Sequence, residues 1–248
     1  MRFAPSTPTR IAVATRAVVC VLAGLTVAPF VAADERAAAD AGDGRAPTVH
    51  ASPEDGGPRR FAVVGEGALP LRDAPSATAS TVAAVAGGEP LANLGCALAE
   101  GDVWCRVRPL DGGAEGHALA ARLVSAAGPD GTVPTGTDDS ERRARRRDFD
   151  AEVTVACAQE RGEALGECTA RVARAGGGDA AVVVTFPNGF ARTLRFVHGA
   201  FASANATMSG TGTDADARME EGLHRVRVDD QRYEIPDALV VGPSPERD

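Results

Sequence analysis

The amino-acid sequence predicts an all-β protein with two β-rich parts, a small N-terminal barrel and a C-terminal antiparallel β domain. Between residues 59 and 125, short apolar segments follow one another closely and are separated by Gly- and Pro-containing turns, a pattern typical of small barrels and sandwiches. Between residues 150 and 242, pairs of apolar or alternating segments flank short turns, as in β-hairpins. Four cysteines beyond residue 90 suit crosslinking of small domains.

The N-terminus has the composition of a secretory signal. Residues 1–16 contain three arginines and no acidic residue, an apolar run extends from 17 to 33, and it ends on the small residues Ala32 and Ala33. We predict a signal peptide over residues 1–33 that is cleaved after Ala33. A retained membrane anchor is one alternative, although the run is short for a bilayer and contains Pro29. A lipoprotein is another, although Cys20 lies at the start of the apolar run.

Export and charge together define which partners we expect. The chain carries a net charge of −8, and loss of the three signal-peptide arginines makes the mature chain −11. Such a charge favours solubility and argues against binding to nucleic acid or to anionic membranes. We therefore predict a periplasmic or secreted protein with no stable membrane insertion after signal cleavage.

The cysteines predict two disulfides. Cys96, Cys105, Cys157 and Cys168 remain once Cys20 has left with the signal, and an even number in an exported chain indicates disulfide bonds. A hairpin turning at Glu100-Gly101 sets Cys96 opposite Cys105, and Cys157 then pairs with Cys168 by elimination. The alternatives are a zinc site, for which the spacings are long, and a catalytic thiol, which an unpaired cysteine would support.

Composition divides the rest of the mature chain into segments. Residues 34–58 are rich in Ala, Gly, Asp and Pro and predict a disordered lead-in. Residues 126–149 predict a linker whose second half, 141–148, is a run of arginines flanked by acids. We interpret this run as a solvated segment, the alternative being a patch that docks to anionic lipid or to a partner. In the part between them we expect strands at 60–64, 69–72, 81–85, 90–94, 103–107 and 116–119, with Leu123 closing the barrel.

The C-terminal part, residues 150–242, predicts two hairpins. The first pairs residues 180–186 with 191–197 around Pro187-Asn188-Gly189, and the second pairs 223–228 with 231–235 across Asp229-Asp230. A strand at 200–204, a long polar loop from 205 to 221 and a last short strand at 239–241 complete the prediction. The side chains of Arg192 and Arg195 are expected to lie on the outward, solvent-exposed face of their strand.

The N-terminal motifs resemble those of bacterial SH3 (SH3b) domains. Leu69-Pro-Leu71-Arg72-Asp73-Ala74-Pro75-Ser76 resembles the family's opening L-x-V-R-s-x-P-s, and residues 82–91 resemble the following v-i-g-x-l-x-x-G-x-x-v. Val103-Trp104-Cys105-Arg106-Val107 resembles W-x-x-V, and Glu115-Gly116-His117-Ala118 stands where G-W-V is usual. The resemblance covers about 60 residues and implies a small barrel that binds cell-envelope ligands. His117 departs from the family, which often has an aromatic residue there.

The C-terminal part resembles the β-rich domain that follows SH3b modules in some alphaproteobacterial exported proteins. The resemblance lies in its Phe-Pro-Asn-Gly turn and in its Tyr233-Glu-Ile-Pro236 ending. It adds no functional expectation of its own.

No segment carries a Gly-x-Ser-x-Gly, His-Glu-x-x-His or Walker motif, so we predict a non-enzymatic module without cofactor or metal. The expected partner is a peptidoglycan peptide or a cell-envelope protein. The candidate ligand-binding residues are Arg72, Asp73, Trp104 and His117, with Trp104 expected first of all to pack in the barrel core. The alternative function is a cell-wall hydrolase, or a regulator of one.

Overall fold

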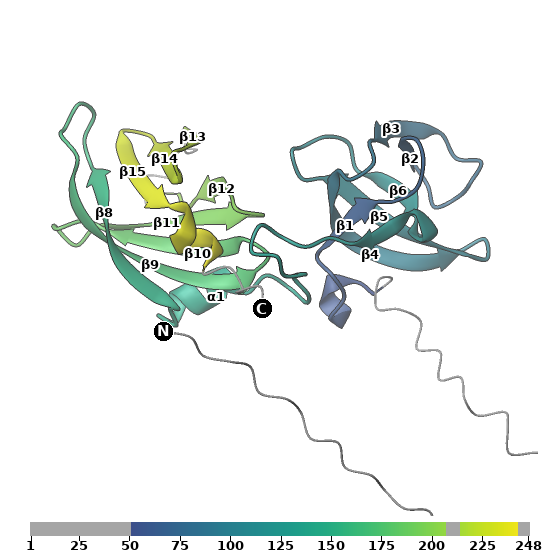
Figure 1. Ribbon diagram of the computed structural model, residues 1–248, viewed down its shortest axis with the longest axis horizontal. Helices are drawn as coiled ribbons and strands as arrows, with labels where there is room; N and C mark the ends of the chain where they lie inside the picture. Colours follow the sequence, from purple (N-terminus) through teal and green to yellow (C-terminus); the bar gives the residue numbers. More distant parts are fainter. Residues whose placement is uncertain (1–50, 207–213, 243–248) are drawn as a thin grey trace, which may run out of the picture. The chain divides into compact units, whose positions relative to one another are not determined.

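The structure is a computed structural model that describes residues 51–206 and 214–242, which belong to one compact unit. They form two antiparallel β-sheets (Figure 1). The all-β prediction is confirmed. The predicted signal peptide, residues 1–33, and residues 34–50 of the predicted lead-in lie outside the described residues. Along the described chain, no helix has the length and apolar character needed to cross a membrane.

The N-terminal sheet contains seven strands in the order β3-β2-β6-β5-β4-β1-β7. Every strand predicted between residues 59 and 125 is present, and β4 and β5 are longer than expected. The strands are β1 (Arg60–Val63), β2 (Leu69–Arg72), β3 (Thr81–Val85), β4 (Pro90–Ala99), β5 (Asp102–Pro109), β6 (Gly116–Leu119) and β7 (Leu123–Ser125). Two short 3-10 helices accompany them, Pro53–Asp55 and Ala120–Arg122.

The hairpin of β4 and β5 turns where the sequence predicted. Glu100 and Gly101 both have positive φ, 52° and 89°, as a two-residue turn that follows the twist of the strands requires. Cys96 therefore lies directly opposite Cys105, and the two form a disulfide. One face of the sheet carries the core, which includes Phe61, Leu71, Leu91, Cys105, Val107 and Ala118, all fully buried.

The C-terminal sheet contains eight strands in the order β12-β11-β10-β9-β8-β15-β14-β13. The two edge strands, β12 and β13, contact each other, so the sheet curls back toward itself. The strands are β8 (Ala151–Ala158), β9 (Gly166–Gly176), β10 (Asp179–Thr185), β11 (Ala191–Val197), β12 (Ala200–Ala204), β13 (Ala215–Glu220), β14 (Leu223–Val228) and β15 (Gln231–Pro236). Both predicted hairpins are confirmed, and Cys157 and Cys168 form the second disulfide.

Two predictions for the C-terminal part are wrong. Part of the expected loop 205–221 is strand β13, which alternates Ala215, Ala217 and Met219 with charged residues but buries none of its side chains. The expected strand at 239–241 is part of helix α2 (Asp237–Val241). Three apolar residues are too few to distinguish a strand from a helical turn, and the helix buries both Leu239 and Val240 against the core.

The expected outward position of Arg192 is also wrong. Residues three apart in a strand point to opposite faces, so Arg192 lies on the core face of β11 and is only 1% exposed, whereas Arg195 lies on the other face. The guanidinium of Arg192 donates to Gln231 Oε1 at 2.9 Å and to the carbonyl of Asn205 at 2.7 Å. Tyr233 donates to the same Gln231 oxygen at 2.6 Å. Burial raises the pKa of Tyr233 to about 12.

The segments predicted as lead-in and linker make defined contacts where the structure describes them. Ser52 accepts the Cys96 N–H at 3.3 Å, and Pro53 is buried. In the segment 126–149, part of the arginine-rich run forms helix α1 (Ser140–Arg145), which packs on β9 and β10. Its Ala144 contacts Ala173 and Ala181, while its arginines stay largely exposed.

Candidate functional site

Two of the predicted ligand-binding residues lie in one cross-strand row on the N-terminal sheet. Arg72 on β2 pairs with His117 on β6, and His117 pairs with Arg106 on β5. Because neighbouring residues of a strand alternate between faces, this row lies opposite the core positions Leu71 and Ala118. We call Arg72, His117 and Arg106 the basic row.

The basic row is not neutralised by carboxylates. Arg72 donates to the carbonyl of Ala79 at 2.9 Å and to Thr81 Oγ1 at 3.1 Å, and Arg106 is exposed. Among the described residues, neither guanidinium forms an ion pair. His117 Nδ1 is buried and has no hydrogen-bond partner within the described part of the chain. The row is therefore rich in donors and lacks acceptors.

Trp104 lies two residues before Arg106 on the same face of β5. It is only 7% exposed, but alternation places it on the face opposite Cys105 and Val107, and it does not belong to the core cluster that these residues form. Its Nε1 has no partner among residues 51–206 and 214–242. Asp73 lies apart from the row, in the loop after β2, where its N–H donates to the carbonyl of Ser80 at 3.0 Å.

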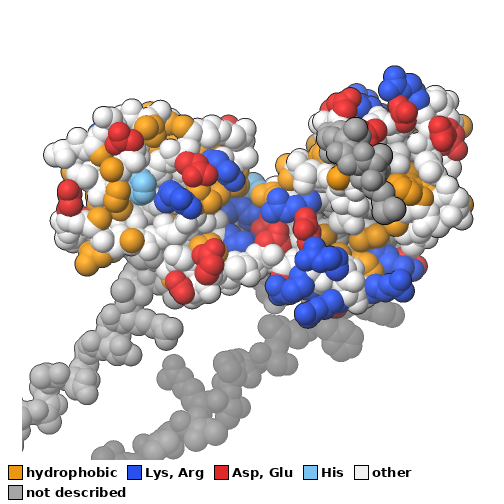
Figure 2. All heavy atoms as spheres, turned by 180° about the vertical axis from the view of Figure 1, so that it is seen from behind, with side chains coloured by type: hydrophobic (Ala, Val, Ile, Leu, Met, Phe, Trp, Pro, Cys, Tyr) orange, Lys and Arg blue, Asp and Glu red, His pale blue; other side chains and the backbone are white. Residues whose placement is uncertain are grey.

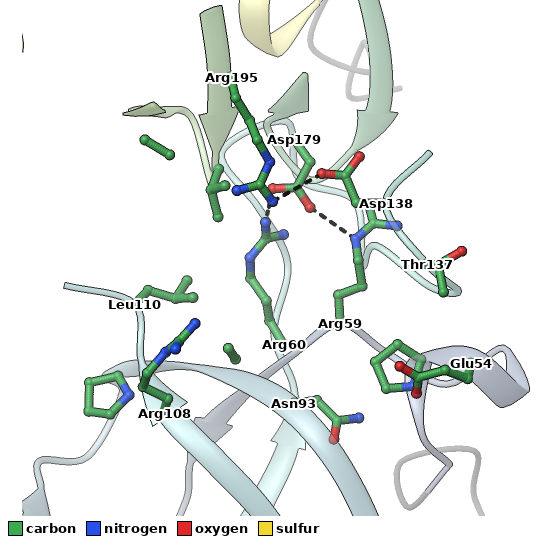
Figure 3. A pocket seen from close by; sticks show the side chains of 15 residues that line it. Glu54, Arg59, Arg60, Asn93, Arg108, Leu110, Thr137, Asp138, Asp179 and Arg195 are labelled. Carbon is green, nitrogen blue, oxygen red and sulfur yellow. Dashed lines mark hydrogen bonds and ion pairs between the residues drawn. The ribbon is translucent and has the colours of Figure 1, made fainter. Parts of the chain in front are cut away.

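A second cluster was not expected from the sequence and joins the two sheets. Arg59 Nε donates to Asp179 Oδ2 at 2.9 Å, and the guanidinium of Arg60, at the start of β1, contacts Asp179 Oδ1 (Figure 3). Arg59 also donates to the carbonyls of Ala175 at 2.6 Å and of Thr135 at 3.0 Å. We call Arg59, Arg60 and Asp179 the joint. Burial lowers the pKa of Arg60, although Asp179 opposes this effect.

The predicted linker completes the joint. Asp130 accepts the Gly177 N–H at 2.6 Å and the Thr132 N–H at 3.0 Å. Burial opposes ionisation of Asp130, but these hydrogen bonds outweigh it and lower its pKa. The turn between β9 and β10 contains Gly176, Gly177 and Gly178, all with positive φ. A Cβ on Gly177 would lie 2.6 Å from Pro134 Cγ, so glycine is needed for the close approach of the two segments.

His198 stands next to the joint. Its backbone N–H donates to Asp179 Oδ1 at 2.9 Å. Burial lowers the pKa of its imidazole, and the charge of Arg60 lowers it further, against the opposing effects of Asp179 and Asp130. The neutral imidazole is therefore the form that the folded joint prefers.

A cleft of about 440 Å³ opens beside the joint (Figure 3). Arg108, Pro109 and Leu110 line it from the N-terminal sheet, and Arg195, Val197 and Ala202 line it from the C-terminal sheet. Arg59, Arg60 and Asp179 also line it, together with Pro53, Glu54, Ala92, Asn93, Thr137 and Asp138. Four arginines and three carboxylates thus surround one cavity.

Many of the other arginines pair with carboxylates. In the view of Figure 2, basic and acidic side chains lie interspersed. Arg143 contacts Asp148 and Asp150, for example, and Arg227 contacts Asp214 and Asp216. Such exposed pairs neutralise each other locally and contribute little stability.

Arg106 could have been predicted, whereas the joint could not. Arg106 shares the face of Trp104 by simple alternation along the strand. Arg59, Arg60 and Asp179 lie in unrelated segments, and the nearest signal was the Gly176-Gly177-Gly178 run, which predicts a close approach of backbones without naming its partner. Within the described residues, no group of three or more His, Cys, Asp or Glu side chains is placed to hold a metal ion.

The geometry therefore offers two surfaces rich in guanidinium groups, the basic row and the cleft. The four cysteines of the described residues are all in disulfides. Comparison of the whole chain with protein-family models, with curated proteins and with solved structures found no match.

Proposed function

We propose that this protein is an exported, non-enzymatic binding module that engages a cell-envelope ligand, either a peptidoglycan peptide or an envelope protein, through its N-terminal sheet. The observation that carries the proposal is the basic row, in which Arg72, His117 and Arg106 follow one another across three strands without a carboxylate partner. The two disulfides favour an oxidising compartment outside the cytoplasm.

The chemistry of the row suits carboxylates. A guanidinium group presents its donors in a planar fork that matches a carboxylate, and charge-assisted hydrogen bonds of this kind are the stronger ones. Peptidoglycan peptides and acidic protein loops both carry exposed carboxylates. The row lies on paired strands, so the backbone positions that carry its side chains stand at fixed spacing.

A pull-down on purified peptidoglycan tests the proposal. The double variant Arg72→Ala/Arg106→Ala should lose most of the binding of the wild type. The double variant Arg161→Ala/Arg171→Ala removes the same charge from exposed positions on the C-terminal sheet and its loops, so it should retain binding. Equal loss in both variants would show that only net charge matters.

An envelope protein is the second source of carboxylates. If the wild type does not sediment with peptidoglycan, crosslinking in an envelope fraction should capture one protein whose yield falls in the Arg72→Ala/Arg106→Ala variant and not in the control. The hydrolase alternative has its own test, the release of soluble muropeptides by wild type and by Cys157→Ser. Release that this change abolished would contradict a non-enzymatic module.

A further inference from the structure

The joint beside the cleft contains two guanidinium groups and one carboxylate, all of them nearly buried. Arg59 and Arg60 share the single carboxylate of Asp179, and their side chains are only 10% and 3% exposed. Carbonyl oxygens take the remaining contacts, Thr135, Gly136, Ala175 and Gly176 for Arg59 and Gly177 for Arg60. Carbonyl dipoles stabilise a cation but do not cancel its charge, and a buried unbalanced charge is costly.

The floor of the cleft is shaped by a small residue. Ala92 on β4 pairs with Arg108 on one side and with Arg60 on the other. A methyl side chain between two long ones leaves a hollow with a guanidinium at each side. Arg60 is held by the joint, whereas Arg108 has half of its side chain exposed and is free to reorient.

The opposite wall adds a second adaptable cation. Arg195 has 38% of its side chain exposed, and its contacts with Asp138 at 3.5 Å and Glu141 at 3.9 Å are long. Arg108 contacts Glu115 at 3.3 Å, and both of these side chains are about half exposed. An exposed pair such as Arg108–Glu115 is worth at most about 1 kcal/mol, and Arg195 makes only long contacts, so an incoming anion can compete for both arginines.

The remaining walls would accommodate a small apolar body. Pro109, Leu110, Val197 and Ala202 contribute short aliphatic surface, while Asn93 and Thr137 contribute neutral polar groups. The volume of the cleft lies at the small end of the range for small-molecule sites. Asp138 and Asp179 already contact arginines, and Glu54 is the one exposed carboxylate at the rim.

We propose that this cleft is a binding site for an organic carboxylate with a short aliphatic body, held between Arg108 and Arg195 and completed only when the two sheets are joined. A free carboxylic acid and the C-terminal end of a peptide share this chemistry. The site is separate from the basic row, because Arg72 and His117 do not line the cleft. It goes beyond the proposed function, since it needs residues of the C-terminal sheet.

Ligand-detected NMR on the full mature chain tests this site with three probes: N-acetyl-alanine, N-acetyl-alanyl-alanine, and the C-terminal methylamide of N-acetyl-alanine. Both acids should bind and the methylamide should not. Tighter binding of the dipeptide acid would identify a peptide end as the better ligand, and equal binding would identify the carboxylate alone. Raising the salt concentration from about 0.01 M to about 1 M should weaken the acids, because screening shortens the reach of the charges.

Matched variants test the two arginines of this site. Arg108→Ala and Arg195→Ala should each weaken binding of the acids by about tenfold, the change expected for loss of one charge-assisted contact. Arg171→Ala, which removes the same charge from a half-exposed arginine outside both the cleft and the basic row, should leave it unchanged. Trp104 fluorescence and circular dichroism show whether each variant is folded.

Several results would overturn the inference. The first is equal binding of acid and methylamide. The second is absence of binding of both acids at concentrations up to about 10 mM, well above the range of ordinary metabolite sites. The third is an equal effect of Arg108→Ala and Arg171→Ala. Loss of peptidoglycan binding in Arg72→Ala/Arg106→Ala with retained binding of the acids would support both sites. Retained peptidoglycan binding in that variant would contradict the basic row without affecting the cleft.

Discussion

Arg60 and Asp179 stand 119 residues apart in the sequence and form an ion pair in which both side chains are almost completely buried, 3% and 4% exposed. Arg60 begins the first strand of the N-terminal sheet, and Asp179 begins β10 in the middle of the C-terminal sheet. A buried ion whose partner is removed costs several kcal/mol. The pair therefore couples the stability of the two sheets.

Removing the carboxylate of the joint should uncouple the sheets. Asp179→Asn keeps the size of the side chain but leaves two buried guanidinium groups without a counter-charge, and we expect a loss of about 3–5 kcal/mol. Trp104 is the only tryptophan and Tyr233 the only tyrosine, so each reports on one sheet. In urea, tryptophan fluorescence and second-derivative tyrosine absorbance should change together in the wild type and separately in the variant.

The control for this experiment is Glu152→Gln. Glu152 pairs with Arg171 at 2.5 Å, but both side chains are about half exposed, so the change should cost less than about 1 kcal/mol. Its two transitions should remain coincident. A wild type whose transitions already differ would contradict the coupling of the sheets through the joint.

Two glycines with the same backbone conformation should differ sharply in their tolerance of alanine. Gly178 and Gly189 have φ of 78° and 85°. An alanine at either position would therefore cost roughly 1–2 kcal/mol for its left-handed backbone conformation. A Cβ on Gly178 would lie 2.5 Å from the Gly199 nitrogen and 2.7 Å from Pro129 Cγ, whereas one on Gly189 meets nothing within 4 Å. Gly178→Ala should therefore cost a further 1–3 kcal/mol or so, measured by urea denaturation. Equal costs would show that the linker is not packed against this turn.

The two disulfides should contribute comparably to stability, because they span similar separations of 9 and 11 residues. The chain-entropy model assigns about 3 kcal/mol to each, so Cys96→Ser/Cys105→Ser and Cys157→Ser/Cys168→Ser should each lose about that amount in urea denaturation. Thiol titration of the unfolded, unreduced mature protein should find no free sulfhydryl. Four free sulfhydryls would contradict both the disulfides and the oxidising compartment.

Stability should fall as the pH drops below about 6.5, the ordinary pKa of histidine. Burial lowers the pKa of His224 despite its hydrogen bond to Asp237, and burial also lowers that of His198. The unfolded chain therefore binds more protons than the folded one in this range, and the free energy of unfolding decreases as the pH falls.

Urea denaturation at pH 7.5 and 5.5 measures this effect, and His224→Gln should reduce the difference between the two conditions. Asp130 and Asp150 also have lowered pKa values, which hydrogen bonds maintain against the effect of burial. Their stabilisation is present above their ordinary pKa of 3.8 and is lost only at lower pH, so it does not interfere. If the pH dependence of the free energy of unfolding were unchanged in His224→Gln, groups other than His224 would be responsible for it.

Local patterns were enough to predict most of the secondary structure and both disulfide pairs. The Glu100-Gly101 turn defined the register that sets Cys96 opposite Cys105, because a two-residue hairpin leaves one pairing for every residue that follows. Strands β8 and β13 were missed although both alternate in the sequence. In β13 the apolar positions are two alanines and a methionine, and none of its side chains is buried.

Local signals in the sequence predict most strands of the N-terminal sheet, two hairpins of the C-terminal sheet and both crosslinks, because alternation and turn chemistry act over a few residues. They do not predict that Arg59 and Arg60 contact Asp179, that Arg192 is buried, or that Arg108 and Arg195 line the same cleft. These contacts join segments separated by tens of residues or more, and no local preference of the backbone specifies which distant charge will lie opposite a given guanidinium group. Their partners follow from how the two sheets pack.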